Sequence, residues 1–413
     1  GRGTPNEGGQ PAREPAEERR AGPPEAPLYD DEEKYQGITD DRIHLCGHAA
    51  LVFAEAFDTR PEDLNVYWEW VNDNGGIHGR RVTMSWKDDS YSPDQAVQAA
   101  QSCKSENPFM LIGGIGFDQI PSVRTWAEQN RMLYLHHIAV APDRTYNFSY
   151  SAQPTVDETG RAFGEYIASR HGDKPVGIIW RQSEFWEPGH RRGREVLDAE
   201  GVDVRADLPV QRNQSLYSQE IAELQAQGAE VVWIWENALA AAQIIQQARQ
   251  QGYTPKWIVF PFQTTLDVVG DAALDPTTIE GVASWSAYVP GGYGGAFAEH
   301  GYDEEIKRFE EVFARYRSRG RTNDILWQVW VGNKWLHDLL EKCGRDCNRN
   351  RIAGMFLSGY KTLVEPSCVA DFAHANSFGG HIGGHEFYTL ETFRTDSGGP
   401  GFETTGWCSA HLN

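Results

Sequence analysis

The sequence has no run of about 18 apolar residues, the length that a helix needs to cross a bilayer. Basic residues are also scarce, because 38 Lys and Arg stand against 59 Asp and Glu and leave a formal net charge of -21. A nucleic-acid backbone requires a basic surface, so this balance argues against nucleic-acid binding. Acidity of this kind mainly favours solubility.

Recognisable catalytic signatures are missing as well. The chain contains no Gly-x-Ser-x-Gly elbow, no His-Glu-x-x-His helix and no P-loop. No motif therefore proposes a nucleophile with its base or a bound cofactor. We expect a protein that is not an enzyme and that uses no cofactor.

Cysteines are few and contain no Cys-x-x-Cys zinc pair, but their number is even, at six. An even set favours disulfides and a location outside the cytoplasm. Proximity in sequence favours pairing Cys343 with Cys347. Cys46, on the first expected strand, is then paired with Cys103 at the end of a nearby helix. The two remaining cysteines, Cys368 and Cys408, are expected to form a disulfide in the C-terminal tail.

The first residues are rich in Pro, Glu, Arg and Gly and show no apolar period. Such a segment cannot bury enough surface to fold. We therefore expect residues 1–36 to form a disordered tether between a lipid anchor and the folded body. A start derived from cloning is the alternative explanation.

At 413 residues the chain suits two domains, and an alternation of strands and helices begins at Arg42. Phe109–Asn130 is expected to form an apolar strand, a glycine-rich turn and a helix. Ser92, Pro93 and Gln95 have the pattern of a helix N-cap, a first-turn proline and a capping box. The other expected strands are 42–51, 80–89 and 131–142, and the other expected helices are 61–76 and 92–103.

A similar series follows residue 160 and predicts a second α/β unit with a parallel sheet and right-handed crossovers. Its expected helices are 162–172, 189–201, 218–228 and 239–252, and its expected strands are 175–180, 202–210, 230–235 and 256–262. Helices at 303–320 and 324–344 and a strand at 385–393 come later. These late segments indicate a chain that crosses between its two lobes more than once.

The turn "GGIGFDQ", residues 113–119, lies where α/β proteins bind ligands, at the carboxyl end of a strand. It lacks the Lys-Ser/Thr of a P-loop and the full spacing of a dinucleotide site. The aromatic Phe117 and the acidic Asp118 are therefore the residues that a ligand hypothesis must explain.

Several segments in this order are similar to one known family. They are "VNDNGGIHGRRV", "DDSYSPDQAVQAA", "FMLIGGIGFDQIPSV", "MLYLHHIAVAP", "AEVVWIWENALAAAQIIQQARQQGY" and "IEGVASWSAYVP". The chain resembles, over roughly residues 37–360, the leucine/isoleucine/valine-binding branch of the type I periplasmic binding proteins, the solute receptors of ABC importers. The segment after about Glu365 resembles it poorly.

The resemblance implies an α/β fold of two Rossmann-like lobes joined by a hinge of several crossovers, each lobe a parallel sheet flanked by helices. Lobe 1 is expected to contain residues 37–151 and 284–355. Lobe 2 is expected to contain residues 152–283 and 356–413, with the C-terminal tail. Ligand is expected to bind between the lobes and to stabilise their closed arrangement.

The resemblance also implies positions for an amino-acid ligand, and this chain departs from them. The hydroxyl position of the first lobe falls on Phe117, the Ala-Ala-Thr segment on Ile138, Ala139 and Val140, and the acid of the second lobe on Phe262. Burying a zwitterion without donors or a counter-charge costs several kcal/mol. We therefore expect a flat or apolar organic ligand and not a plain α-amino acid.

The other expected contacts are aromatic side chains and polar groups that orient the ligand. They are His137, Phe185, Trp186, Trp235, Trp285 and Tyr288, with Asp118, Gln119, Glu236, Asn237 and Gln263 as the orienting groups. A sugar is an alternative ligand, and so is a cation held by cation-π contacts with aromatic rings together with the carboxylate of Asp118 or Glu236. For each aromatic residue the alternative is packing between the lobes without ligand contact.

Histidines and paired acids give weaker signals. His374, His381 and His385 lie within a glycine-rich stretch and are candidates for a metal site, but their spacing matches no standard signature. His48 and His136 are expected to be packed and hydrogen-bonded. Asp88 and Asp89 are expected to organise the following helix start.

Together these features predict an extracytoplasmic, lipid-anchored, monomeric solute-binding protein that delivers its ligand to the permease of an ABC importer. A branched-chain or aromatic amino-acid-binding protein, a ligand-sensing domain of the same fold and an enzyme on that fold are the alternatives.

Overall fold

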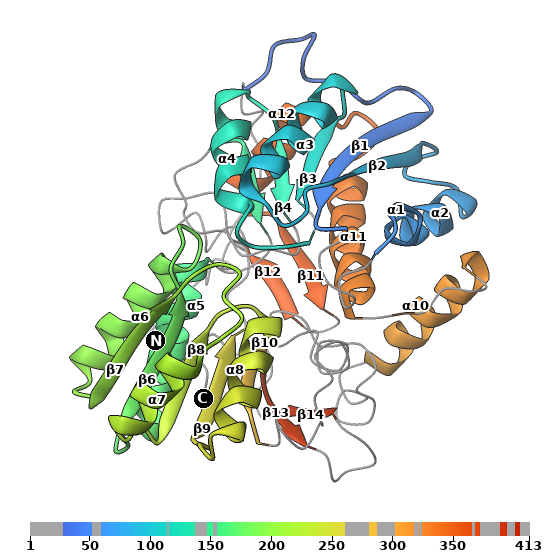
Figure 1. Cartoon of the computed structure of the whole chain (residues 1–413). Helices are drawn as coiled ribbons and strands as arrows, with labels where there is room; N and C mark the ends of the chain where they lie inside the picture. Colours follow the sequence, from blue (N-terminus) through green and yellow to red (C-terminus); the bar gives the residue numbers. More distant parts are fainter. Residues whose placement is uncertain are drawn as a thin grey trace, which may run out of the picture.

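The computed structural model describes residues 28–51, 59–113, 115–136, 147–151, 155–260, 281–286, 302–317, 322, 324–365, 368–371, 389–394 and 401–404. Two α/β lobes are visible in Figure 1, one built mainly from the first strands and the other from the middle of the chain. Within the described residues no helix is both long and apolar enough to span a bilayer.

The sheet of lobe 1 has the strand order β2-β1-β3-β4-β5, and all of its pairings are parallel. Its strands are β1 (Arg42–Ala49), β2 (Arg81–Asp88), β3 (Met110–Gly113), β4 (Tyr134–His136) and β5 (Ser149–Ser151). β3 and β4 are buried along their whole lengths, as strands covered on both faces should be.

Helices from two distant parts of the sequence flank this sheet. Trp68 in one of them donates through Nε1 to Asn333 Oδ1 in another at 3.1 Å. The helices are α1 (Pro61–Leu64), α2 (Val66–Asp73), α3 (Pro93–Ser105), α4 (Ile120–Gln129), α10 (Tyr302–Tyr316), α11 (Asp324–Cys343) and α12 (Arg349–Leu357). The chain therefore returns to lobe 1 after building lobe 2.

The sheet of lobe 2 has the strand order β14-β13-β10-β9-β8-β6-β7. Its strands are β6 (Val176–Arg181), β7 (Val204–Val210), β8 (Val231–Trp235), β9 (Lys256–Phe260), β10 (Ala283–Ser286), β13 (Thr389–Arg394) and β14 (Gly401–Thr404). The pairings from β7 to β10 are parallel, whereas β13 and β14 add an antiparallel edge. The helices of this lobe are α5 (Val156–His171), α6 (Glu187–Ala199), α7 (Ser218–Ala226) and α8 (Ala238–Gln250).

The predicted fold class of two parallel-sheet lobes with several crossovers is confirmed. A separate antiparallel pair, β11 (Lys361–Glu365) with β12 (Cys368–Asp371), lies between the lobes in Figure 1. The sequence did not predict β5, α12, β11, β12 or β14, which span three to nine residues each. Segments this short show too few repeats of an apolar period to be recognised.

The start of the packed body differs from the expected tether. Tyr29 is buried, its backbone N–H donates to Asn350 Oδ1 at 2.9 Å, and its carbonyl accepts from Asn350 Nδ2 at 2.8 Å. The Arg349 guanidinium lies 5.1 Å from the Tyr29 ring centre. Residues 28–36 are therefore fastened to α12, a helix that the sequence did not predict.

The predicted start of α3 is correct in backbone and wrong in side-chain detail. Ser92 is the N-cap and Pro93 lies in the first turn, but the Ser92 side chain makes no capping hydrogen bond. The acids before it organise the approach to the helix, because Asp88 Oδ1 accepts from Ser90 N at 3.1 Å and Asp89 Oδ1 from Tyr91 N at 2.9 Å.

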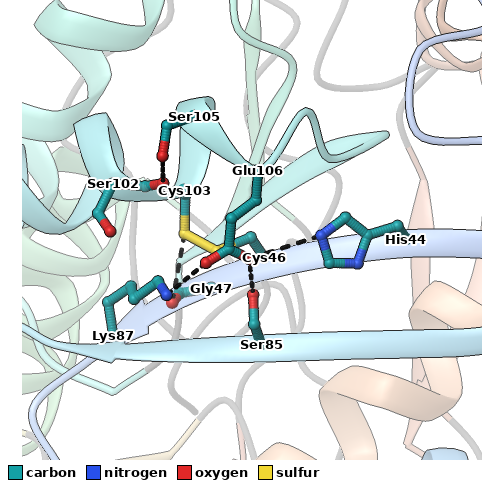
Figure 2. The surroundings of a disulfide bond; sticks show 9 residues. All are labelled: His44, Cys46, Gly47, Ser85, Lys87, Ser102, Cys103, Ser105 and Glu106. Atoms are coloured by element: carbon teal, nitrogen blue, oxygen red, sulfur yellow. Dashed lines mark hydrogen bonds and ion pairs between the residues drawn. A yellow bond between two sulfur atoms is a disulfide. The ribbon is translucent and has the colours of Figure 1, made fainter.

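Two disulfides are formed by described residues of lobe 1, and both confirm pairings that the sequence predicted. Cys46 on β1 is bonded to Cys103 on α3, and both side chains are fully buried (Figure 2). Cys343 is bonded to Cys347 just after α11. Cys408 lies outside the described residues, so its pairing with Cys368 stays a prediction.

Glycines allow α5 and α6 to pack closely over lobe 2. A Cβ on Gly160 would lie 1.9 Å from the carbonyl oxygen of Gly189, and one on Gly164 would lie 2.7 Å from that of Gly193. On its other side α6 lies against the sheet, because a Cβ on Gly189 would lie 2.3 Å from the Trp235 ring. This contact fixes the start of α6, which follows the predicted ligand residues Phe185 and Trp186.

We expect Gly160→Ala to lower the free energy of unfolding by about 1–3 kcal/mol, because the added methyl group forces the two helices apart. Ser169→Ala, on an exposed position of α5, is the control and should change it by less than about 0.5 kcal/mol. Chemical denaturation measures both values. Equal stability of the two variants would contradict this packing argument.

Removing the disulfide Cys46–Cys103 by double Ala substitution should destabilise the protein more than removing Cys343–Cys347. The first closes a loop with a sequence separation of 57 residues and the second a loop of 4, and the entropy that a cross-link removes from the unfolded chain grows with loop length. The expected loss for the longer loop is about 2–5 kcal/mol. A larger fall in melting temperature from the short-loop variant would contradict this expectation.

Candidate functional site

The candidate site lies where the carboxyl ends of the parallel strands of the two lobes meet. Lobe 1 contributes the turn between β3 and α4, of which Ile115–Gln119 are described. Lobe 2 contributes Arg181 at the end of β6, the segment leading to α6, and Glu236 directly after β8. Parallel α/β sheets bind ligands at this edge, and the sequence predicted the site at the same edge.

Asp118 joins the lobes through hydrogen bonds to three residues of lobe 2. Its Oδ2 forms an ion pair with Arg181 Nη1. Its Oδ1 accepts from Ser183 Oγ and from Trp186 Nε1, each at 3.0 Å. The Asp118 side chain is 3% exposed, so the lobes are in direct contact here and exclude water from this carboxylate.

Arg181 has a second carboxylate partner within its own lobe. Its Nε donates to Glu236 Oε1 at 2.6 Å, and the other carboxylate oxygen of Glu236 accepts from the backbone N–H of Asn237. The Arg181 side chain is 4% exposed and that of Glu236 is 1% exposed. The site therefore buries one guanidinium together with two carboxylates.

Burial and the neighbouring charges shift the pKa values of these groups. Burial raises the pKa of Glu236 to about 7, although Arg181 and the Asn237 amide act in the opposite direction. Burial by itself would lower the pKa of Arg181, but Glu236, Tyr91 and Asp118 together raise it above its ordinary value. Arg181 therefore keeps its charge, and below about pH 7 a proton on Glu236 offsets the excess negative charge.

Phe117 carries the aromatic contact between the lobes. Its ring centre lies 5.3 Å from that of Phe185, 5.5 Å from that of Trp186 and 6.2 Å from that of Phe260. Phe185 and Trp186 are fully buried, whereas Phe117 is half-buried. An aromatic side chain of lobe 1 thus lies against an aromatic wall of lobe 2.

A second contact between the lobes lies beside Asp118. Arg212, just after β7, donates through Nη2 to the carbonyl oxygen of Tyr91 in lobe 1. The Arg212 guanidinium lies 5.9 Å from the centre of the Tyr91 ring. The lobes are therefore held together by charged as well as aromatic groups.

Other predicted site residues have structural roles. Trp235 is fully buried, donates from Nε1 to the Trp186 carbonyl at 2.7 Å and stacks on Phe260 at 4.5 Å. Asn237 caps α8 by accepting from Ala240 N at 2.9 Å. Trp235 therefore packs behind the aromatic residues of lobe 2, and Asn237 fixes the segment that carries Glu236.

Gln119 points into lobe 1 and away from the other lobe. It is fully buried, and its Nε2 donates to the Ile115 carbonyl at 2.9 Å and to Asp89 Oδ1 at 3.2 Å. The structure thus brings together Phe117, Asp118, Phe185, Trp186 and Glu236 at the lobe contact. Gln119, Trp235 and Asn237 lie one layer behind them.

Further predicted residues lie outside the described part of the chain, so their roles stay predictions. They are His137, Ile138, Ala139, Val140, Phe262, Gln263, Tyr288, His374, His381 and His385. For Trp285, the described backbone lies in β10, paired with Leu390 of β13. Among the residues that the structure describes, no three His, Cys, Asp or Glu side chains are grouped to hold a metal ion.

Three residues at this contact were not predicted from the sequence: Arg181, Ser183 and Phe260. Arg181 had a recognisable signal, because a lone charge ends the apolar strand "VGIIWR" and such a charge needs a partner when it is buried. Ser183 and Phe260 had no local signal, since their place at the lobe contact depends on how the strands pair.

His48 belongs to a buried network in lobe 1. Its Nδ1 lies 2.8 Å from Asp89 Oδ2, and its Nε2 lies 2.8 Å from the Tyr134 hydroxyl. Burial holds the pKa of Tyr134 well above its ordinary value, so the hydroxyl keeps its proton. The expectation of a packed, hydrogen-bonded histidine is confirmed for His48 and also for His136, which is fully buried with Nε2 3.2 Å from Ser149 Oγ.

The raised pKa of Glu236 predicts a pH-dependent stability. A carboxyl group whose pKa is higher in the folded state stabilises that state below its unfolded pKa of 4.5, and this contribution is lost as the pH rises through about 7. The stability of the wild type minus that of Glu236→Gln should therefore fall by up to about 3 kcal/mol between pH 4.5 and 8.

Urea denaturation across this pH range measures the difference. Glu200→Gln, at an exposed position after α6, is the control and should show no such trend. A difference for Glu236→Gln that stays flat, or that rises with pH, would contradict the burial argument.

Comparisons with known proteins agree with this geometry. The sequence model of a family described as periplasmic binding protein matches residues 64–385. The leucine-, isoleucine-, valine-, threonine-, and alanine-binding protein of Pseudomonas aeruginosa is 20% identical over 220 residues, covering 52% of this chain and 59% of that protein. The matches cover 52% to 59% of the length of the first two curated relatives.

Solved structures show the same fold at low sequence identity. A fatty acid ABC transporter substrate-binding protein from Thermomonospora curvata has a TM-score of 0.71 at 16% identity, covering 91% of this chain and 95% of that chain. A solute-binding protein of an ABC transporter from R. palustris, in complex with benzoate, has a TM-score of 0.66 at 13% identity, covering 90% and 98%. With the family match over most of the chain, these findings show that the chain belongs to the type I periplasmic binding proteins, in the family that contains the branched-chain amino-acid-binding proteins.

Proposed function

We propose that this chain is an extracytoplasmic solute-binding protein that captures a small aromatic or otherwise apolar organic ligand between its lobes by hinge closure. The observation that carries the proposal is the meeting of Phe117 and Asp118 of lobe 1 with Arg181 and Trp186 of lobe 2 at the strand ends. A ligand that contacts both groups at once stabilises the closed arrangement.

The side chains at this contact favour an apolar ligand over a plain α-amino acid. Phe117, Phe185 and Trp186 offer ring surface, and an α-ammonium group would have to take Asp118 or Glu236 away from Arg181. Such an exchange leaves the buried guanidinium with one carboxylate partner in place of two, which is costly. Solved structures of this fold include one named as a fatty acid ABC transporter substrate-binding protein and one in complex with benzoate, which supports the proposed ligand class.

An amino-acid ligand is the second candidate, because the Pseudomonas aeruginosa relative is named for five amino acids. In either case the partner is the permease of an ABC importer, and the protein acts as a lipid-anchored monomer without catalysis. A ligand-sensing domain of this fold would bind ligand equally well and differ in its partner. Ligand uptake by vesicles that carry the cognate permease distinguishes the two.

A thermal-shift screen of aromatic acids, neutral aromatics, fatty acids, sugars, amino acids and quaternary amines tests the proposed ligand class, because a ligand of the folded state raises the melting temperature. We expect aromatic or alkyl compounds to raise it and branched-chain amino acids to leave it unchanged. A shift with branched-chain amino acids alone would overturn the proposed class.

Phe117→Ala should weaken the binding of a compound found in this screen by about tenfold or more, because it removes ring contact worth about 1–3 kcal/mol. Tyr35→Ala is the control, since Tyr35 is an aromatic residue with an exposed side chain. Titration calorimetry measures both. Equal affinities for the two variants would place the ligand away from Phe117.

A further inference from the structure

Arg181 has a donor that the protein does not use. Its Nε donates to Glu236 and its Nη1 to Asp118, whereas Nη2 donates to no acceptor in the described part of the chain. The Arg181 side chain is only 4% exposed, so this donor lies at a largely enclosed contact. The described residues therefore leave one Arg181 donor open where the lobes meet.

We propose that Arg181 binds the carboxylate of the ligand, and that Asp118 is an internal carboxylate which the ligand displaces from Arg181. The inference rests on the proposed function, because it requires a ligand between the lobes. It narrows the ligand class to carboxylates with an apolar body, such as aryl or alkyl acids.

The geometry of the Asp118 contact favours this exchange. Asp118 reaches Arg181 through Oδ2 alone, because Oδ1 is occupied by Ser183 Oγ and Trp186 Nε1. A ligand carboxylate has no such ties and can accept from Nη1 and Nη2 together. Two parallel N–H···O bonds from a guanidinium are stronger and more directional than one.

The number of buried charges also favours replacement of Asp118 by the ligand carboxylate over binding of both at Arg181. Replacing Asp118 with a ligand carboxylate leaves one guanidinium and two carboxylates in the site, as in the structure. Adding the ligand while Asp118 stays would bury a third carboxylate against one cation, which is costly. Asp118 lies in a turn of lobe 1, so separating the lobes moves it away from Arg181.

A cationic ligand is the rival, since it would neutralise the excess negative charge. The unfilled group at the site, however, is a donor. Each carboxylate oxygen of Asp118 and Glu236 already accepts at least one hydrogen bond, whereas Nη2 of Arg181 donates none within the described residues, so the site favours a ligand acceptor over a ligand cation.

The surroundings of Arg181 fit the apolar body of such an acid. The guanidinium carbon lies 5.9 Å from the Trp186 ring centre, and Trp186 in turn contacts Phe117 and Phe185. A carboxylate on Arg181 therefore places an attached aryl or alkyl group against these rings.

Titration calorimetry with matched probes tests the inference. The probes are benzoate, benzamide and benzyltrimethylammonium, with octanoate and octanamide as the alkyl pair. At least one carboxylate should bind the wild type about tenfold or more tightly than its amide, because the amide lacks the charge that pairs with Arg181.

Asp118→Asn is the decisive variant. Its side-chain oxygen can still accept from Ser183 and Trp186, but it offers no competing anion to Arg181. Carboxylate affinity should rise about threefold or more, whereas a ligand held by Asp118 itself would bind more weakly. Asp94→Asn, an exposed acid on α3, is the matched control and should leave every affinity unchanged.

Arg181→Lys keeps the positive charge but loses the planar guanidinium that can donate two parallel hydrogen bonds. It should therefore weaken the binding of carboxylates at least about tenfold and leave the binding of amides unaffected. If this variant does not fold, the wild-type probe series and Asp118→Asn decide the matter. Weaker carboxylate binding by Asp118→Asn, or preference of the wild type for amides or the cation, overturns the inference and keeps the proposed function. Binding of no compound in the wider ligand screen overturns both.

Discussion

One buried ion pair connects the two halves of this molecule, and the arrangement of the lobes depends on it. Arg181, at the end of a lobe 2 strand, is held by Glu236 of its own lobe and by Asp118 of the other. A buried guanidinium is costly unless its partners are well placed, so the three side chains stabilise one another as a set. Breaking the Asp118 contact weakens the contact between the lobes, while the Glu236 contact keeps Arg181 in position.

This division of roles suits the hinge closure proposed for this protein. Separating the lobes costs the ion pair, the Ser183 and Trp186 hydrogen bonds and the Phe117 ring contacts. A ligand can shift the equilibrium only by its differential affinity for the closed arrangement. If it replaces Asp118 on Arg181, its own binding energy must exceed what the protein gains from closing on itself.

The remainder of the fold keeps each half of the site rigid. The buried disulfide between Cys46 and Cys103 fastens α3 to β1 in lobe 1. In lobe 2 the Gly160 and Gly189 contact sets α6 against α5 and the sheet, and α6 begins directly after Trp186. We therefore expect movement between the lobes to be concentrated at their contact, where the hydrogen bonds of Asp118 either form or break.

The sequence alone determined the two α/β lobes and the pairing of Cys343 with Cys347, because apolar periods and near neighbours are local properties. It also singled out the "GGIGFDQ" turn, whose described residues lie at the contact between the lobes, and it paired Cys46 with Cys103 through the strand and helix expected to carry them. It did not reveal that Trp235 supports the wall from behind or that Gln119 points into lobe 1, since side-chain direction depends on packing. Only tertiary structure decided that Asp118 pairs with Arg181. These residues are 63 positions apart on different lobes, and no local pattern records a contact made by bringing two strand ends together.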